Sequence, residues 1–191
     1  MPPARIQVVS LLPHPETPSR AVRRIDAHVS RTPDGMLSLR YILAGDPNRL
    51  RIPPAKSARI ADELWHHTCY EAFVVRNEHP DYYEFNFAPS GEWAVYAFRR
   101  YRERVPLGID ATDVNPRIVT RADTKTLELD AVIRLDRLWP MHPGARLSLA
   151  LCAVIEDQDG SLSYWALKHP PGKPDFHHSD AFALELDEIR N

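Results

Sequence analysis

Proline residues spread along the whole chain limit its fold more than any other feature. The sequence has 18 prolines among 191 residues, about twice the average share of roughly 5%, and they separate short apolar runs. Because proline lacks an amide proton and its ring clashes with the preceding turn of a helix, this spacing leaves little room for long helices. The chain is therefore predicted to be mainly β.

Two segments show the alternation of apolar and polar side chains that is typical of half-buried strands: Met36 to Leu43 and Thr126 to Ile133. Further strands are expected at Ile6 to Leu12, Val22 to Val29, Trp65 to Val75, Tyr82 to Phe87, Trp93 to Phe98, Arg117 to Thr120, Leu147 to Val154, Ser163 to Leu167 and Phe182 to Leu186. Helix is predicted only at Ser57 to Leu64 and in the turn Leu135 to Trp139. Many short strands separated by turns predict an all-β sandwich or barrel, with residues 1–191 in one domain.

Charge, cysteine content and hydropathy exclude several classes of protein. The 24 Lys and Arg against 26 Asp and Glu give a net charge of -2, which creates no general attraction to nucleic acid or to anionic membranes. Cys69 and Cys152 could form at most one bridge, so a disulfide scaffold is excluded. No apolar run approaches the roughly 18 residues of a membrane-spanning helix. We expect a soluble, cytoplasmic protein with both cysteines reduced.

Three strands in the middle of the chain are predicted to form two consecutive antiparallel hairpins. A tight turn over Ser90 and Gly91 would place Phe87 opposite Ala94. Symmetrical closure of the preceding loop would place Glu71 opposite Asn86. One face of the three strands then holds mostly aromatic side chains and is expected to lie in the core. The opposite face collects Trp65, His67, Cys69, Glu71, Glu84, Asn86 and Trp93.

This mixed face has the residue types of a small-ligand site. Trp65 and Trp93 can stack on a flat ligand, because large aromatic side chains are costly to leave exposed on a polar face. Glu71, Glu84 and Asn86 can then hydrogen-bond its polar groups. The alternative is a sheet face that is simply solvated, since antiparallel sheets commonly turn one polar face to water.

A polar loop follows the expected strand that ends at Leu167. Three prolines and a glycine fix its path, and it concentrates the side chains of Lys168, His169, Lys173, Asp175, His177 and His178. We expect this loop to border the ligand face, with its lysines favouring an anionic group. His and Asp at such close spacing can also bind zinc or iron, whereas hydrogen-bonded imidazoles that stabilise the loop are the alternative.

The run from Tyr96 to Arg104 interleaves aromatic and basic residues, as single-stranded nucleic-acid sites do. With a net charge of -2 we interpret it instead as aromatic side chains alternating into the core, with arginines lining a rim. The sequence lacks Gly-x-Ser-x-Gly, His-Glu-x-x-His, Cys-x-x-Cys and any Gly-rich phosphate loop, so no familiar catalytic motif is present.

Three segments together resemble the DOMON-like bacterial family, which is related to the family 9 carbohydrate-binding modules. They are Leu64 to Phe73, Tyr82 to Trp93 and His169 to His178, and the resemblance extends over Ile6 to Leu186. It implies a jelly-roll-like antiparallel β-sandwich that binds sugars or haem without performing catalysis. In relatives that bind sugar, tryptophan stacks on the ligand, and Trp65 and Trp93 are the matching candidates.

We therefore predict a non-catalytic protein that binds a small sugar or sugar derivative. Two alternatives stay open. Glu71 and Glu84 on adjacent strands could act as acid and base on a glycoside, which would make the protein an enzyme. A haem or metal protein would instead use His67, His169, His177 or His178, so the cofactor is left unassigned.

Overall fold

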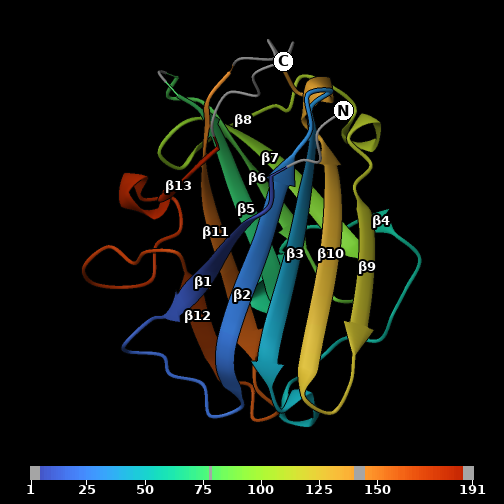
Figure 1. Cartoon of the computed structure of the whole chain (residues 1–191), viewed down its shortest axis with the longest axis vertical. Helices are drawn as coiled ribbons and strands as arrows, with labels where there is room; N and C mark the ends of the chain where they lie inside the picture. Colours follow the sequence, from blue (N-terminus) through green and yellow to red (C-terminus); the bar gives the residue numbers. More distant parts are fainter. Residues whose placement is uncertain (1–4, 78, 140–144, 187–191) are drawn as a thin grey trace.

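Two mainly antiparallel sheets stack face to face in the computed structural model, which describes residues 5–77, 79–139 and 145–186 (Figure 1). The first sheet runs in the order β1 (Gln7–Pro13), β2 (Val22–Arg31), β3 (Met36–Gly45), β10 (Thr126–Arg134) and β9 (Arg117–Ala122). The second runs β4 (Arg59–Ile60), β7 (Glu92–Arg100), β6 (Tyr82–Phe87), β5 (Cys69–Arg76), β11 (Leu147–Glu156) and β12 (Leu162–Ala166). Two short strands, β8 (Glu103–Val105) and β13 (Leu184–Leu186), pair with β7 and β11.

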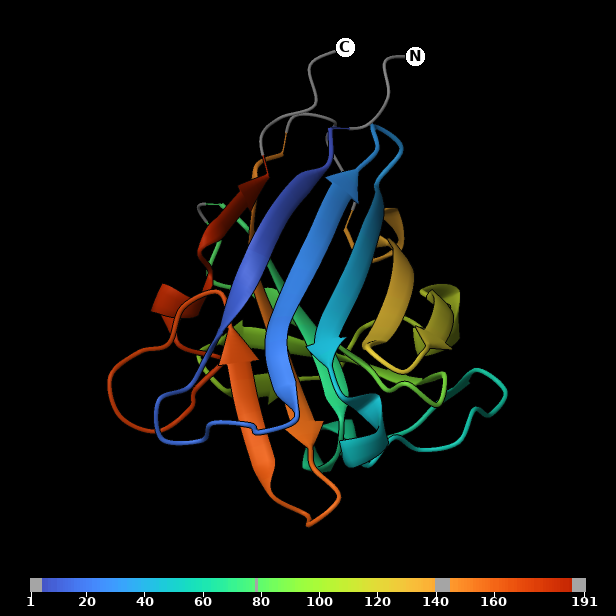
Figure 2. The ribbon, with the colours of Figure 1, turned by 60° about the horizontal axis from the view of Figure 1, so that its bottom comes forward.

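Strand β1 joins the two sheets along one side of the sandwich. Its first part, Gln7 to Leu11, pairs with β2, whereas Leu12 and Pro13 pair with β12. Figure 2 shows β1 crossing from one layer to the other, beside the strongly twisted β2 and β3. The β-sandwich class predicted from the sequence is confirmed, and β4 is an exception to the antiparallel pattern because it runs parallel to β7.

The main core lies between the sheets and follows the alternation read from the sequence. On β3 and β10 every second side chain is buried, including Tyr41 and Leu129, and Tyr70 and Phe85 of the second sheet face them. The Tyr41 hydroxyl crosses the core and donates a hydrogen bond of 2.7 Å to the Glu71 carbonyl. Full burial of each such side chain stabilises the fold by about 1.5–3 kcal/mol.

The expected strands are present, most of them within two residues of their predicted bounds, but two expectations are wrong. Residues 57–64 are not a helix: the chain there is extended, forms β4 and ends in a 3-10 turn at Leu64–His66. Consequently β5 begins at Cys69 rather than at Trp65. Lys56 and Arg59 both bind the Glu92 carboxylate, which holds this segment along the edge of β7.

Helical structure within the described residues is limited to three-residue 3-10 turns. They are Pro47–Arg49, Leu64–His66, Ala111–Asp113, Leu135–Arg137 and Ser179–Ala181. None of these helices is long and apolar enough to cross a membrane.

The register between β6 and β7 differs by one residue from the prediction. Phe87 lies opposite Trp93 rather than Ala94, while Glu71 lies opposite Asn86 as expected. The turn has three residues, since the Ala88 amide donates to the Glu92 carbonyl, and Gly91 closes it with a φ of +92°. A glycine in this left-handed region is typical of three-residue hairpin loops. Because side chains alternate with a period of two, the extra residue turns every side chain of β7 to the other face.

The outer face of the second sheet carries a second apolar cluster. Phe73, Tyr96 and Phe98 from β5 and β7 pack there with Phe176 and Ala181 of the C-terminal loop. This loop therefore folds over the sheet and leaves a hollow between itself, the sheet and the segment that precedes β5.

Candidate functional site

A cavity of about 510 Å³ opens on this outer face, within the range usual for small-molecule sites. Strands β5, β6, β7, β11 and β12, the 3-10 turn before β5 and the C-terminal loop all contribute to it. Its lining consists of Trp65, His66, Glu71, Phe73, Glu84, Tyr96, Phe98, Arg102, Arg104, Val154, Leu162, Tyr164, Pro174, Phe176 and His177.

Two pairs of aromatic rings form parts of the wall. Trp65 packs edge-on against Tyr96, with ring centres 5.7 Å apart. Tyr164 of β12 packs against Phe176 of the C-terminal loop at 6.1 Å. Trp65 and Tyr164 are only partly buried, so their rings remain accessible to a ligand.

Two carboxyl groups and one amide lie on the strands that form the floor. Glu71 on β5 and Glu84 on β6 are 3% and 5% exposed and both line the cavity. Asn86 is fully buried and donates from Nδ2 to Glu84 Oε1 at 2.7 Å. Its own Oδ1 lies 3.7 Å from the Cys69 thiol. Asn86 therefore holds Glu84 in place and does not itself reach the cavity.

The two carboxyl groups prefer to keep a proton. Burial raises the pKa of Glu84 to about 7. Burial, and then the neighbouring charge of Glu84, raises the pKa of Glu71 well above its usual range. Burial disfavours the charged form of any carboxyl group, and a second carboxylate close by adds to the effect. At neutral pH the pair thus holds at least one proton.

His177 of the C-terminal loop faces Glu84 as a neutral ring. Burial, with the Arg102 charge, lowers the pKa of His177 to about 4. The Tyr82 hydroxyl lies 2.8 Å from His177 Nδ1 and accepts a hydrogen bond from the Arg102 amide at 3.2 Å. If Tyr82 donates to Nδ1, the ring proton is on Nε2, which lies 3.6 Å from Glu84 Oε2.

Two arginines stand at the rim. Arg104 lies over the Tyr96 ring, with Cζ 4.0 Å from its centre. Arg102 binds Asp175 at 2.8 Å, and Asp175 also accepts from the Tyr101 hydroxyl at 2.7 Å. Asp175 thereby ties the C-terminal loop to the turn between β7 and β8, beside the cavity but outside its lining.

The structure places the two predicted tryptophans on opposite faces. Trp65 lines the cavity, as expected, but Trp93 is 2% exposed in the main core because of the shifted register. Trp93 is thus not positioned to stack on a ligand at this cavity. Val95 and Ala97 turn inward with it, and Tyr96 and Phe98 lie on the outer face of the sheet.

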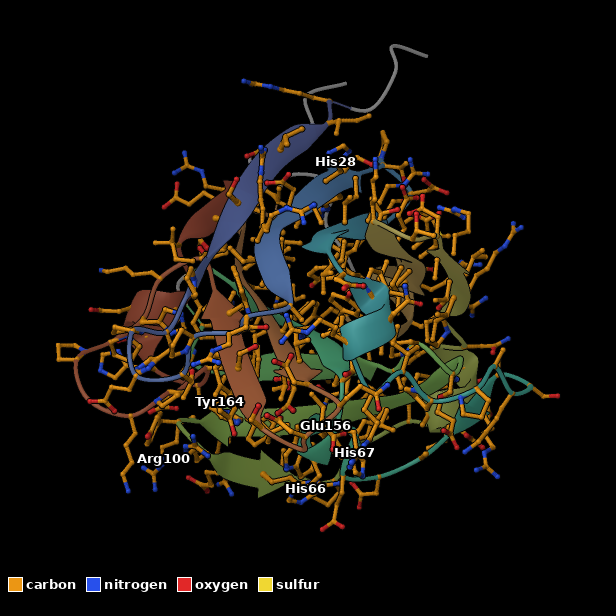
Figure 3. The ribbon with its side chains drawn as sticks, turned by 90° about the horizontal axis from the view of Figure 1, so that it is seen from below. His28, His66, His67, Arg100, Glu156 and Tyr164 are labelled. Carbon is orange, nitrogen blue, oxygen red and sulfur yellow. The ribbon has the colours of Figure 1, made fainter. Side chains whose placement is uncertain are left out.

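Several other predicted site residues serve structural contacts outside the cavity. His67 Nδ1 donates to Glu156 Oε2 at 2.8 Å, and Figure 3 shows the two side chains close together. Arg51 binds the other oxygen of Glu156 at 2.6 Å. Lys168 pairs with Asp180 at 3.4 Å across the surface. Lys173 is exposed and does not line the cavity. Neither lysine lines the cavity, so these two side chains do not support the expected preference for an anionic group.

The loop histidines do not converge on a single point. His169 bonds the Leu12 carbonyl at 2.8 Å, and His178 accepts from the Asp180 amide at 3.2 Å. His177 alone of the three lines the cavity. Within the described residues no three His, Cys, Asp or Glu side chains are grouped as ligands for a metal ion. The loop histidines instead make the stabilising hydrogen bonds that were the alternative prediction.

Reasoning from the sequence missed three of the four aromatic rings that form the wall. Tyr96 was assigned to the core, and Tyr164 and Phe176 were not singled out. The arginines were expected at a rim, and Arg102 and Arg104 do line one. Gly91 is the sequence feature that could have placed Tyr96 in the cavity. A three-residue turn that ends in this glycine puts Tyr96 on the same face of the sheet as Glu84.

A second hollow, of about 500 Å³, lies on the outer face of the first sheet between β1, β2, β3, β10 and β9. Its charged groups are largely satisfied by one another, since both Arg40 and Arg121 bind Asp130. The described residues that line it include no Trp, Tyr or Phe and no fully buried carboxyl group. The cavity on the second sheet is therefore the stronger candidate for a ligand site.

No protein-family model matches the sequence, and no curated protein matches it. Among solved structures, a candidate carbohydrate-binding protein from Bacteroides uniformis is similar in fold, with a TM-score of 0.63, 15% identity, and coverage of 93% of this chain and 83% of that one. Two structures of a family 9 carbohydrate-binding module from Caldicellulosiruptor kristjanssonii are also similar. The cellotriose complex has a TM-score of 0.55 and 11% identity, and the match covers 87% of this chain and 75% of that one. The glucose complex has a TM-score of 0.54 and 12% identity, and the match covers 93% of this chain and 83% of that one. At these identities the likeness concerns the fold, which is the β-sandwich of family 9 modules.

Proposed function

We propose that this protein is a non-catalytic sugar-binding module whose ligand occupies the cavity on the second sheet. One observation carries the proposal: aromatic rings and buried polar groups line the same hollow. Trp65 and Tyr164 offer partly exposed ring faces, and Glu71 and Glu84 lie beneath them. A pyranose ring presents an apolar face that can stack on aromatic side chains and hydroxyl groups that can donate to carboxyl oxygens.

The solved structures of similar fold support this proposal. The two from Caldicellulosiruptor kristjanssonii are complexes with cellotriose and with glucose. We extend this to a small sugar in the present chain because the cavity volume and its residue types fit such a ligand. Membership of the DOMON-like family and a cytoplasmic location are further parts of the proposal.

Calorimetric titration with glucose and cellotriose tests the function directly. Stacking plus a few hydrogen bonds typically gives a dissociation constant of roughly micromolar to millimolar size. Tyr164→Ala should weaken binding at least about tenfold, since it removes one wall of the cavity. His28→Ala is the control, because His28 lines the hollow on the first sheet. If His28→Ala loses binding and Tyr164→Ala keeps it, the ligand binds on the first sheet and the proposed site is wrong.

The glycosidase alternative makes a different prediction for the same carboxyl groups. If Glu71 and Glu84 act as acid and base, a chromogenic glycoside that binds should also be cleaved, and Glu84→Gln should abolish cleavage. We expect binding without product release over a long incubation. Cleavage that disappears in Glu84→Gln and persists in a Glu128→Gln control would overturn the non-catalytic assignment.

A further inference from the structure

We propose that the sugar bound here carries a protonated amino group, and that this ammonium sits between Glu71 and Glu84 at the floor of the cavity. The inference rests on the proposed function and narrows its ligand class from sugars in general to amino sugars. It comes from an imbalance between acceptors and donors at the floor.

Glu71 provides the first half of that imbalance. Its side chain is 97% removed from solvent and lines the cavity, and among the described residues no donor reaches its Oε1 atom. A buried acceptor without a partner is uncommon in native proteins and calls for an explanation at the site. A ligand that donates to Glu71 from the cavity would supply that partner.

Glu84 provides the second half. Oε1 accepts from Asn86, but Oε2 faces His177 Nε2 at 3.6 Å, beyond hydrogen-bond distance. The nearest cations are engaged elsewhere, since Arg102 binds Asp175 and Arg104 lies on the Tyr96 ring. Both carboxyl groups therefore line the cavity, and among the described residues neither is paired with a cation of its own.

An ammonium group matches this floor better than a hydroxyl group does. It offers three donors and no acceptor, so it can bridge both carboxyl groups without adding a further lone pair. The aromatic walls also attract cations through the negative face of each ring. Arg104 over Tyr96 shows one ring of the wall already in contact with a cation.

The proton held by the carboxyl pair gives the proposal a pH signature. Bound ammonium favours the ionised pair, so binding releases a proton and weakens as the pH falls below about 7, the pKa of Glu84. A neutral sugar does not compete with that proton in this way. The titratable and charged groups that face the pair are Asp62, Tyr96, Arg102, Arg104, His177, Tyr82, Tyr41, Cys69 and Cys152.

The test compares four monosaccharides by calorimetry: glucose, glucosamine, 6-amino-6-deoxyglucose and N-acetylglucosamine. At least one of the two free amines should bind about five- to tenfold more tightly than glucose, since charge-assisted hydrogen bonds are roughly twice as strong as neutral ones. N-acetylglucosamine, whose nitrogen is uncharged, should show no such gain. Titration in two buffers with different ionisation enthalpies should reveal proton release for the amine and none for glucose.

Variants then assign the effect to the floor. Glu71→Gln and Glu84→Gln should each remove most of the preference for the amine over glucose, whereas Glu128→Gln on the outer face of the first sheet should keep the preference. If one of these variants does not fold, proton release by the wild type still decides. Equal binding of glucose and both amines would overturn this inference and leave sugar binding intact. Failure of all four sugars to bind would overturn both.

Discussion

The Nδ2 group of Asn86 donates a hydrogen bond of 2.7 Å to Oε1 of Glu84, two residues earlier on the same face of β6. Because residues i and i+2 of a strand point to one side, this pairing follows from the local sequence Glu84-Phe85-Asn86. It fixes one carboxylate oxygen and leaves the other directed toward the cavity and His177. A buried amide thus orients the carboxyl group on which the proposed binding depends.

Replacing this amide should change the acidity of its partner. In Asn86→Ala the pKa of Glu84 should rise above its value of about 7, because the hydrogen bond from Asn86 stabilises the ionised form. Loss of the bond should also reduce the free energy of unfolding by about 1–3 kcal/mol. A carbon-detected NMR titration of the Glu84 carboxyl group measures the first effect. A pKa equal to or below the wild-type value would contradict the role assigned to Asn86.

The raised pKa of Glu84 makes stability depend on pH in a defined window. The folded protein holds this proton more tightly than the unfolded chain, so the stabilisation is fully present below the ordinary pKa of 4.5 and is lost as the pH rises to about 7. Over that window wild type should lose roughly 3 kcal/mol of unfolding free energy relative to Glu84→Gln. Urea titrations across the window measure the difference.

Glu92→Gln is the control for that experiment. Arg59, Ser90 and Lys56 bind Glu92, and the hydrogen bond from Arg59 is the main reason that its pKa falls to about 2. The stabilisation from Glu92 is present above pH 4.5 and is lost as the pH falls toward 2. The stability difference between Glu92→Gln and wild type should therefore change with pH below pH 4.5, whereas that of Glu84→Gln changes above it. If the difference in unfolding free energy between wild type and Glu84→Gln does not change from pH 4.5 to about pH 7, burial does not raise the pKa of Glu84 as argued.

The two cysteines should behave as free, shielded thiols. Cys69 and Cys152 are both free and fully buried, and burial raises the pKa of each thiol well above its usual range. Since the thiolate is the reactive form, a thiol reagent should react slowly with the native protein. Under denaturing, non-reducing conditions it should detect both thiols, and one in Cys69→Ala. Rapid reaction of the native protein would show that this part of the second sheet opens readily.

The alternation of apolar residues was sufficient to predict most strands, because each sheet buries one face against the other. The segment 57–64 was misread as a helix because the ion pairs that Lys56, just before it, and Arg59, within it, make with Glu92 are contacts between distant parts of the chain. The side of β7 that faces the core depended on one residue of turn length, and Gly91 decides it. Tyr164 and Phe176 reach the cavity from segments about 80 or more residues beyond Glu84, so no local pattern could place them there.

The contrast between Trp65 and Trp93 separates the site from the core most clearly. Trp65 is partly buried at the cavity wall, so Trp65→Ala should weaken sugar binding about tenfold or more and cost only about 1–2 kcal/mol of stability. Trp93 is buried in the main core beside Phe87, so Trp93→Ala should cost about 3–5 kcal/mol. Denaturant titration and calorimetry on both variants provide the comparison. If Trp65→Ala binds glucose as wild type does while Trp93→Ala remains stable and loses binding, then the ligand stacks on the tryptophan that this structure places in the core, and the cavity assignment is wrong.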